Sequence, residues 1–245
     1  MKVVLIADSH ILTSKEAIEF SNFLRLLYEK HKFDTLILLG DIFDVWFEFK
    51  NVIIDRFFPA LYELKRLKED NVRIIYILGN HDWWSYGFFE EYLSIEVYKS
   101  DYKIVKLNDS INRILISHGD KVYKSKKYKI LLSIMTNPIL EFLYRYFPPF
   151  LGIFLAERFS KSSRKLGKDY CPEYTKKVND KFMELLKRHN VNYGFLGHLH
   201  NFFILKSKDN KGNNFLLYNL PAWYKNKEYI LIDDNEIFLK KGDKT

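Results

Sequence analysis

Five short polar clusters constrain this chain more than any other feature, because each one directly follows a run of aliphatic residues. They are Asp8-Ser9-His10, Gly40-Asp41, Gly79-Asn80-His81-Asp82, Ser117-His118-Gly119-Asp120 and Gly197-His198-Leu199-His200. Five of the seven histidines lie in these clusters, whereas His31 and His189 belong to helical patterns. In α/β folds, the loops that follow the strands converge on one edge of the sheet. The pattern therefore predicts a sheet whose edge gathers all five clusters.

The first 80 residues alternate between strand and helix patterns. Runs of β-branched and aliphatic residues at 2–7, 34–39 and 72–78 are typical of strands buried on both faces. Between them, apolar residues recur at helical spacing, with Ile18, Phe23, Leu24, Leu27 and Tyr28 in one helix and Phe57, Phe58, Leu61, Leu64 and Leu67 in the next. This βαβαβ order predicts an α/β fold with a mostly parallel sheet.

The rest of the chain favours a second sheet interrupted by helices. Strand patterns occur at 103–107, 113–117, 193–197, 202–206, 214–219, 228–233 and 236–240, and short polar turns between several of them indicate antiparallel hairpins. Residues 125–190 have a helical pattern, which Pro138, Pro148 and Pro149 interrupt. We expect residues 125–170 to form a helical cap inserted into a single domain that spans residues 1–245.

Composition excludes several other classes of protein. With 47% hydrophobic residues and only 10 Gly and 6 Pro in 245 residues, the chain is neither disordered nor collagen-like. Cys171 is the only cysteine and cannot form an intrachain disulfide. The stretch before Asp8 is too short for a signal peptide, and the longest apolar run, 147–156, is shorter than the about 20 residues of a membrane span. We therefore expect a cytoplasmic protein.

Together, the clusters offer the ligands of a pair of divalent metal ions. Aspartate, histidine and asparagine supply mixed oxygen and nitrogen donors, and one carboxylate can bridge two ions about 3.5–4 Å apart. No cysteine accompanies them, which argues against a structural zinc site. A single cluster of this kind is more often a buried, hydrogen-bonded histidine or an exposed turn. Five in order at strand ends favour a metal centre.

The ordered series D-x-H, GD, GNHD and GHxH resembles the motif set of the calcineurin-like metallophosphoesterases over residues 8–200. The resemblance implies a four-layer α/β/β/α sandwich with two metal sites. One site would consist of Asp8, His10, Asp41 and His200, and the other of Asp41, Asn80, His118 and His198, so that Asp41 bridges the two ions. We expect two divalent ions, Mn²⁺ first, with Fe, Zn or Mg as alternatives.

A narrower resemblance links the chain to the UDP-2,3-diacylglucosamine hydrolases of lipid A synthesis, which cleave a pyrophosphate and release UMP and lipid X. It rests on the early D-S-H, GDIFDVWF at 40–47, SHGD at 117–120, a helical cap before GHLH, and PAW at 221–223. Those enzymes usually carry arginine where this chain has His81. The resemblance implies a UDP-linked diacyl sugar as substrate, contacted by Asn80, His81, Lys161, Ser162, Arg164 and Lys165.

The motif set also assigns catalytic roles. Two cations would neutralise the charge of a phosphoryl group and lower the pKa of a water between them, so that the water attacks at neutral pH. As in superfamily members with the GNHD motif, His81 would stabilise or protonate the leaving oxygen, and Asp82 would orient His81. The predicted reaction is therefore hydrolysis of a phosphoester or a pyrophosphate.

Charge leaves more than one kind of partner open. A net charge of +8 suits nucleic acid, an anionic membrane surface or a phosphorylated substrate. The basic and aromatic residues gather in the predicted cap and form no recognisable nucleic-acid module, so we expect peripheral contact with the inner face of the cytoplasmic membrane. We expect no nucleic-acid partner and no obligate protein partner.

Two alternative functions remain beside the lipid hydrolase. The first is another calcineurin-like phosphodiesterase or phosphatase, acting on a nucleotide, a nucleic acid or a different lipid. The second, from a different class, is a metal-free scaffold that binds proteins. In a metal-free scaffold we expect some ligand positions to carry residues that cannot bind a metal, and all seven carry ligating residues in this sequence.

Overall fold

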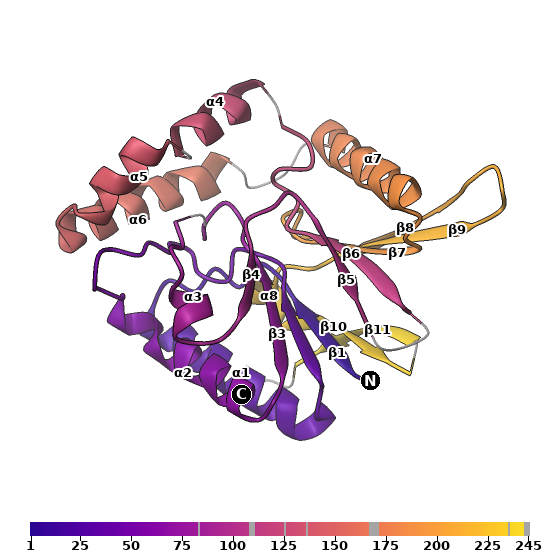
Figure 1. Ribbon diagram of the computed structural model, residues 1–245, viewed down its shortest axis with the longest axis horizontal. Helices are drawn as coiled ribbons and strands as arrows, with labels where there is room; N and C mark the ends of the chain where they lie inside the picture. Colours follow the sequence, from indigo (N-terminus) through magenta and orange to yellow (C-terminus); the bar gives the residue numbers. More distant parts are fainter. Residues whose placement is uncertain are drawn as a thin grey trace.

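Both ends of the chain contribute to one six-stranded sheet (Figure 1). The computed structural model describes residues 1–82, 84–107, 111–124, 126–135, 137–166, 172–234 and 236–242. In spatial order the strands are β11 (Glu236–Lys241), β10 (Glu228–Asp233), β1 (Val3–Ile6), β2 (Thr35–Leu38), β3 (Arg73–Ile77) and β4 (Glu96–Tyr98). Strands β1 to β4 pair in parallel, whereas β10 is antiparallel to both β1 and β11. The parallel order predicted for the first 80 residues is confirmed.

The second sheet has five strands and a mixed topology. In spatial order they are β5 (Lys103–Lys106), β6 (Arg113–Ser117), β7 (Tyr193–Leu196), β9 (Asn214–Asn219) and β8 (Phe203–Lys208). The central strands β6, β7 and β9 are parallel, and the two edge strands are antiparallel to their neighbours. Parallel pairing of β6 and β7 matters for function, because the fourth and fifth polar clusters follow these two strands.

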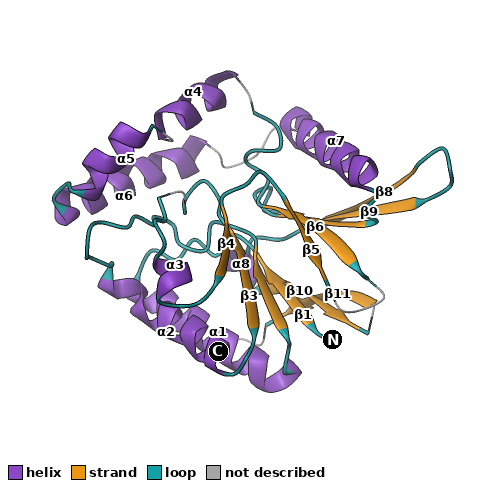
Figure 2. Cartoon of the chain, viewed as in Figure 1, coloured by secondary structure: helices purple, strands orange, loops and turns teal. Residues whose placement is uncertain are grey.

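Helices cover the outer face of each sheet (Figure 2). On the six-stranded sheet these are α1 (Ser14–His31), the 3-10 helix η1 (Asp55–Phe57), α2 (Phe58–Glu69) and α3 (Phe88–Glu91), and on the five-stranded sheet α7 (Pro172–His189). Val4 of β1 packs with the first group of helices, and Leu5 packs against the second sheet. Leu115 of β6 packs against Phe182 of α7. The layers therefore run helix, sheet, sheet, helix, which confirms the predicted sandwich.

Helix α1 shows how local sequence sets an element. Thr13 and Glu16 form a capping box, in which the Thr13 hydroxyl accepts the Glu16 N–H at 3.3 Å and the Glu16 carboxylate accepts the Thr13 N–H at 2.8 Å. The buried stripe runs through Ala17 and Phe20. Ile18, predicted for the apolar face, is 49% exposed, because the first turn of the helix turns Ala17 and not Ile18 toward the core. The predicted helix is correct, but that residue was assigned to the wrong face.

Three helices form the cap: α4 (Lys126–Met135), α5 (Pro138–Arg145) and α6 (Pro149–Leu166). In Figure 1 they lie beyond the carboxyl ends of the strands, on the side of the loops that carry the polar clusters. Residues 125, 136 and 167–171 lie outside the described ranges, so the cap boundaries of 125–170 and the single domain stay predictions. Among the described residues, none of the helices is long and apolar enough to span a membrane.

Candidate dinuclear metal site

The five polar clusters follow the carboxyl ends of β1, β2, β3, β6 and β7, and the fold brings their side chains together. Five of the seven predicted ligands have a positive φ: Asp8 (53°), His10 (46°), Asp41 (51°), His198 (68°) and His200 (58°). This left-handed conformation is uncommon outside glycine and costs on the order of 1 kcal/mol per residue. Such strain is found where side-chain placement serves a function, which supports a site at this edge.

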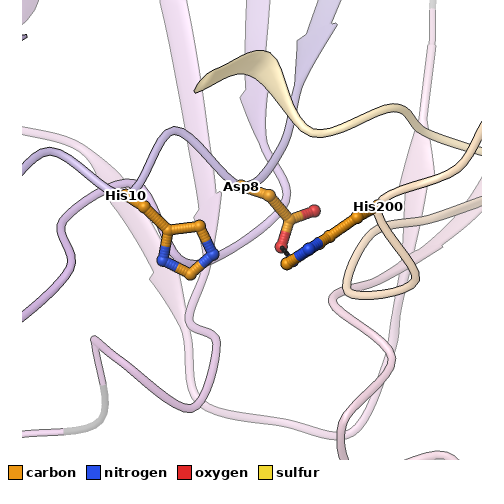
Figure 3. A group of neighbouring side chains, drawn as sticks. All are labelled: Asp8, His10 and His200. Carbon is orange, nitrogen blue, oxygen red and sulfur yellow. Dashed lines mark ion pairs between the residues drawn. The ribbon is translucent and has the colours of Figure 1, made fainter. Parts of the chain in front are cut away.

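Asp8, His10 and His200 form the first group of candidate ligands (Figure 3). Their ligand atoms all lie within 4.8 Å of one another. The Oδ1 atom of Asp8 is 3.2 Å from Nε2 of His200, and its Oδ2 atom accepts the backbone N–H of His198 at 3.0 Å. Asp8 and His10 are buried, whereas the His200 side chain is 22% exposed. This group therefore reaches solvent at His200.

Asp41 lies between this group and a second one. Its Oδ2 atom is 3.9 Å from Nε2 of His10 and 3.4 Å from Nε2 of His118. Burial alone raises the pKa of the Asp41 carboxyl, but the charges of His118 and His81 outweigh burial and hold the pKa well below its ordinary value. Asp41 is thus ionised at neutral pH and faces histidines of both groups, as a bridging carboxylate must.

The second group consists of Asp41, His118 and His198. The Nδ1 atom of His118 contacts the Leu39 carbonyl at 2.7 Å, which leaves Nε2 facing Asp41. Burial lowers the pKa of His118, but the Asp41 carboxylate outweighs burial and raises it to about 10. Burial, followed by the charge of His118, lowers the pKa of His198 to about 4. His198 is therefore a neutral imidazole at neutral pH, the form that binds metals.

Several buried polar atoms of both groups make no hydrogen bond among the described residues. They are Asp8 Oδ1, both ring nitrogens of His10, Asn80 Oδ1 and His118 Nε2. Most of these atoms face an oppositely charged side chain, but buried polar atoms without hydrogen bonds are costly and rare. Their concentration in one place therefore indicates that they bind something. Carboxylate, amide and imidazole donors without thiolate suit Mn, Fe, Zn or Mg. These residues therefore fit divalent metal ions, and the buried amide oxygen of Asn80, the residue before His81, is a further candidate ligand.

His81 lies beside the ligands, and its orienting contact differs from the one we expected. Its Nδ1 atom is 2.6 Å from the backbone carbonyl oxygen of Asp44. The carboxylate of Asp82, the expected partner, instead accepts the backbone N–H groups of Phe43 at 3.3 Å and Gly79 at 3.4 Å. Burial raises the pKa of Asp82 to about 7. In this structure Asp44 therefore holds His81, and Asp82 joins the loops that follow β2 and β3.

Asp44 is a site residue that sequence reasoning missed. Its side chain is buried, and its Oδ1 atom is 3.3 Å from Nδ1 of His10, a candidate ligand. The same loop contacts His81 a second time, because the N–H of Trp46 donates to the His81 carbonyl at 3.0 Å. The only indication in the sequence is the second aspartate of GDIFD. Its spacing alone does not reveal that the loop folds back on two histidines.

The cap is attached to these same loops. Tyr144 of α5 packs against Phe47 and Trp84, with ring centroids 4.8 Å and 4.3 Å away. The carbonyl of Arg145 accepts the N–H of Lys50 at 2.9 Å. Of the predicted substrate contacts, His81 lies at the metal ligands, since its N–H donates to Asp41 Oδ1 at 2.9 Å, and Asn80 precedes it in the chain. The side chains of Lys161, Ser162, Arg164 and Lys165, all on α6, lie outside the described part of the structure.

The cap exposes many large apolar side chains, which we call the cap apolar surface. They are Ile130, Ile134, Ile139, Leu140, Phe142, Leu143, Phe147, Phe150, Leu151, Phe154 and Leu155. Ile139 is 69% exposed and Phe150 is 72% exposed. The basic residues Arg145 and Arg158 are exposed on the same helices. An apolar set of this size on a protein surface marks an interaction site.

Comparison with known proteins agrees with this geometry. The sequence model of the calcineurin-like phosphoesterases matches residues 1–202. The UDP-2,3-diacylglucosamine hydrolase of Psychromonas ingrahamii is 26% identical over 98% of this chain and 96% of that protein. The enzyme of the same name from Porphyromonas gingivalis is 26% identical over 86% of this chain and 84% of that protein. A crystal structure of a dimetal phosphatase from Danio rerio aligns with a TM-score of 0.50 at 13% identity, over 99% of this chain and 96% of that one, a likeness of fold.

Proposed function

The chain belongs to the calcineurin-like phosphoesterase family, and within it we propose that it hydrolyses the pyrophosphate bond of UDP-2,3-diacylglucosamine to UMP and lipid X. A metal-dependent phosphoric ester hydrolase needs ligands, a proton donor and a substrate-binding surface. The two ligand groups and His81 supply the first two. The proposal concerns which substrate the remaining surface selects.

The cap apolar surface is the observation that supports a diacylated substrate, because the cap is attached directly to the loops of the metal site. Tyr144 joins the cap to Trp84, three residues after His81. A small polar substrate has no use for so many exposed aliphatic and aromatic side chains, whereas each buried CH₂ of an acyl chain contributes about 0.8 kcal/mol. The Psychromonas relative aligns over 98% of the chain and therefore across the cap as well.

Two divalent ions, with Mn²⁺ as our first choice, fit the ligand groups. One ion would be held by Asp8, His10 and His200, and the other by Asn80, His118 and His198. Asp41 would be a ligand of both ions. Bound ions would supply positive charge to the phosphate oxygens. The protein supplies the rest: the carbonyl of Asp44 accepts a hydrogen bond from Nδ1–H of His81, so Nε2 is the atom from which His81 would donate a proton to the leaving oxygen. One water is consumed, and two phosphate monoesters are formed.

The same surface supports a proposal about location. Exposed apolar side chains next to Arg145 and Arg158 are what a protein needs to rest on an anionic lipid surface. We propose that the protein is cytoplasmic and contacts the inner face of the cytoplasmic membrane through the cap. This placement would bring the metal site to a lipid substrate without a membrane-spanning segment.

A substrate panel tests the proposed function. The purified protein with Mn²⁺ is given UDP-2,3-diacylglucosamine in detergent, UDP-N-acetylglucosamine, a dinucleotide and bis-p-nitrophenyl phosphate. We expect UMP and lipid X from the first substrate with a kcat/KM at least about 100-fold above that of UDP-N-acetylglucosamine, because the acyl chains contribute apolar binding. Equal rates on the acylated and unacylated sugars, or a preference for the dinucleotide, would replace the lipid hydrolase with a soluble phosphodiesterase.

A further inference from the structure

Two tyrosines outside the seven predicted ligands contact the candidate metal groups, one at each group. Tyr224 lies on α8 (Trp223–Asn226), and its ring centroid is 5.5 Å from that of His10 and 5.8 Å from that of His200. Tyr174 lies in the first turn of α7, and its hydroxyl is 3.4 Å from Nε2 of His198. Neither tyrosine belongs to a polar cluster of the sequence.

Tyr224 contacts its two histidines by ring packing. The interplanar angles are 77° with His10 and 84° with His200, so both contacts are edge-to-face. The backbone holds Tyr224 in place, because its N–H points to the Asp8 carbonyl at 3.4 Å and the preceding residue, Trp223, is buried. His200 is the partly exposed ligand of this group. A fixed ring beside it limits the orientations that the imidazole can adopt.

Tyr174 contacts its histidine through the hydroxyl as well as through its ring, whose centroid is 6.3 Å from that of His198. The Nε2 atom of His198 faces the Tyr174 oxygen, so a neutral His198 with its proton on Nε2 presents Nδ1 as the nitrogen for a metal. The other histidine of this group, His118, is held by the backbone carbonyl of Leu39 and needs no such support. Both groups therefore have an edge-to-face tyrosine ring, and the second group has a hydroxyl contact in addition.

We propose that Tyr224 and Tyr174 are positioning residues that support the two metal sites separately, Tyr224 by the packing of its ring and Tyr174 by its hydroxyl. This inference rests on the proposed dinuclear site. Contacts that orient metal ligands typically change metal affinity by about 10- to 100-fold. Because the Tyr174 contact includes the hydroxyl, Tyr174→Phe should weaken the second site, whereas Tyr224→Phe should leave the first site unchanged.

Mn²⁺ is titrated into metal-stripped protein, and free Mn²⁺ is followed by electron paramagnetic resonance. The binding step lost in His200→Ala identifies the first site, and the step lost in His198→Ala identifies the second.

We expect Tyr224→Ala to weaken the first step about 10- to 100-fold and Tyr224→Phe to leave it unchanged. Tyr174→Phe should weaken the second step about 10-fold and leave the first within about 3-fold. Tyr92→Ala, a 64% exposed tyrosine on the loop after α3, is the matched control and should change neither step.

Three results would overturn the inference. Unchanged Mn²⁺ affinity in Tyr224→Ala and in Tyr174→Phe, with two ions bound to the wild type, removes both tyrosines from metal binding and leaves the proposed function standing. Equal weakening of both steps by either variant means that the contact acts on the fold as a whole. A wild-type protein that binds fewer than two ions overturns the inference and the dinuclear site together.

Discussion

The Nδ1 atom of His81 lies 2.6 Å from the backbone carbonyl oxygen of Asp44, and this contact decides which ring nitrogen faces the ligands. A carbonyl oxygen only accepts, so Nδ1 carries the proton. The Nε2 atom is then directed at the site, 3.9 Å from Oδ2 of Asp41. The Asp44 side chain adds a second contact, since its Oδ1 atom lies 3.9 Å from the same Nδ1 atom of His81.

Replacing His81 separates catalysis from metal binding. We expect His81→Ala to lower kcat by about 10²- to 10⁴-fold, the usual contribution of a general acid, with bound Mn²⁺ unchanged. The kcat of His81→Arg should lie between those of the wild type and His81→Ala, because arginine supplies positive charge but keeps its proton at any working pH. Turnover is measured together with metal content by mass spectrometry. Loss of a metal ion in His81→Ala would make this histidine a ligand, not a proton donor.

Replacing Asp41 should remove both ions at once. Asp41 faces His10 of the first group and His118 of the second, so Asp41→Ala removes the carboxylate that lies between the two groups. We expect no measurable hydrolysis and no rise in Tm on adding Mn²⁺. In the wild type, Mn²⁺ at 100 times its Kd should stabilise the fold by about 2.7 kcal/mol for each ion bound.

The control for Asp41 is a buried carboxylate far from the site. Glu63 of α2 is fully buried and pairs with Arg66 at 2.6 Å. Glu63→Gln should lower Tm but keep the increase produced by Mn²⁺, together with full activity. If the Asp41 variant still binds two ions, Asp41 does not bridge them.

The backbone of Gly79 leaves no room for a side chain beside Asp41. A Cβ atom at position 79 would stand 2.8 Å from the Asp41 nitrogen and would overlap its Oδ1 atom, so the bridging carboxylate would have to move. Displacements of about 1 Å can cost 10²-fold in rate, and we expect at least that loss in kcat/KM for Gly79→Ala.

Gly212 is the matched control for Gly79, since it lies in the turn between β8 and β9 with open space around it and a φ of +84°. Gly212→Ala should cost about 1 kcal/mol of stability and no activity. Comparable activity losses in the two variants would trace the effect of Gly79→Ala to global destabilisation.

The sequence predicted the site residues whose positions follow from strand ends. It did not predict the site residues whose positions depend on contacts between loops. His118 and His198 were predictable because each follows a buried strand, and parallel pairing brings those strand ends together. Asp44 was not predictable in this way, since its contact with His10 requires the loop after β2 to run beside the loop after β1. Tyr224 and Tyr174 lie outside every motif, and only the fold places their rings at the histidines.

The cap posed a different problem for sequence reasoning. An apolar stripe at helical spacing is usually buried, and no periodicity distinguishes a stripe that faces a core from one that faces solvent. The structure leaves Ile139 and Phe150 largely exposed, whereas Ala156 on α6 is buried. Whether a neighbouring layer exists to cover such a stripe is a property of the whole fold, which local sequence does not contain.

Charged substitutions on the cap apolar surface should affect lipid substrates alone. We expect Ile139→Asp combined with Phe150→Asp to lower hydrolysis of UDP-2,3-diacylglucosamine and binding to anionic vesicles by at least about 10-fold, because about 1.4 kcal/mol of lost apolar contact has that effect. Both side chains are mostly exposed, so the fold should tolerate the change. Ile18→Asp, at a 49% exposed position on α1, is the matched control outside the cap and should leave both quantities unchanged.

Bis-p-nitrophenyl phosphate should be cleaved at the wild-type rate by all of these proteins, since the metal ligands lie outside the cap. An equal loss on the soluble ester, or vesicle binding unaffected by the cap substitutions, would exclude the cap from lipid recognition.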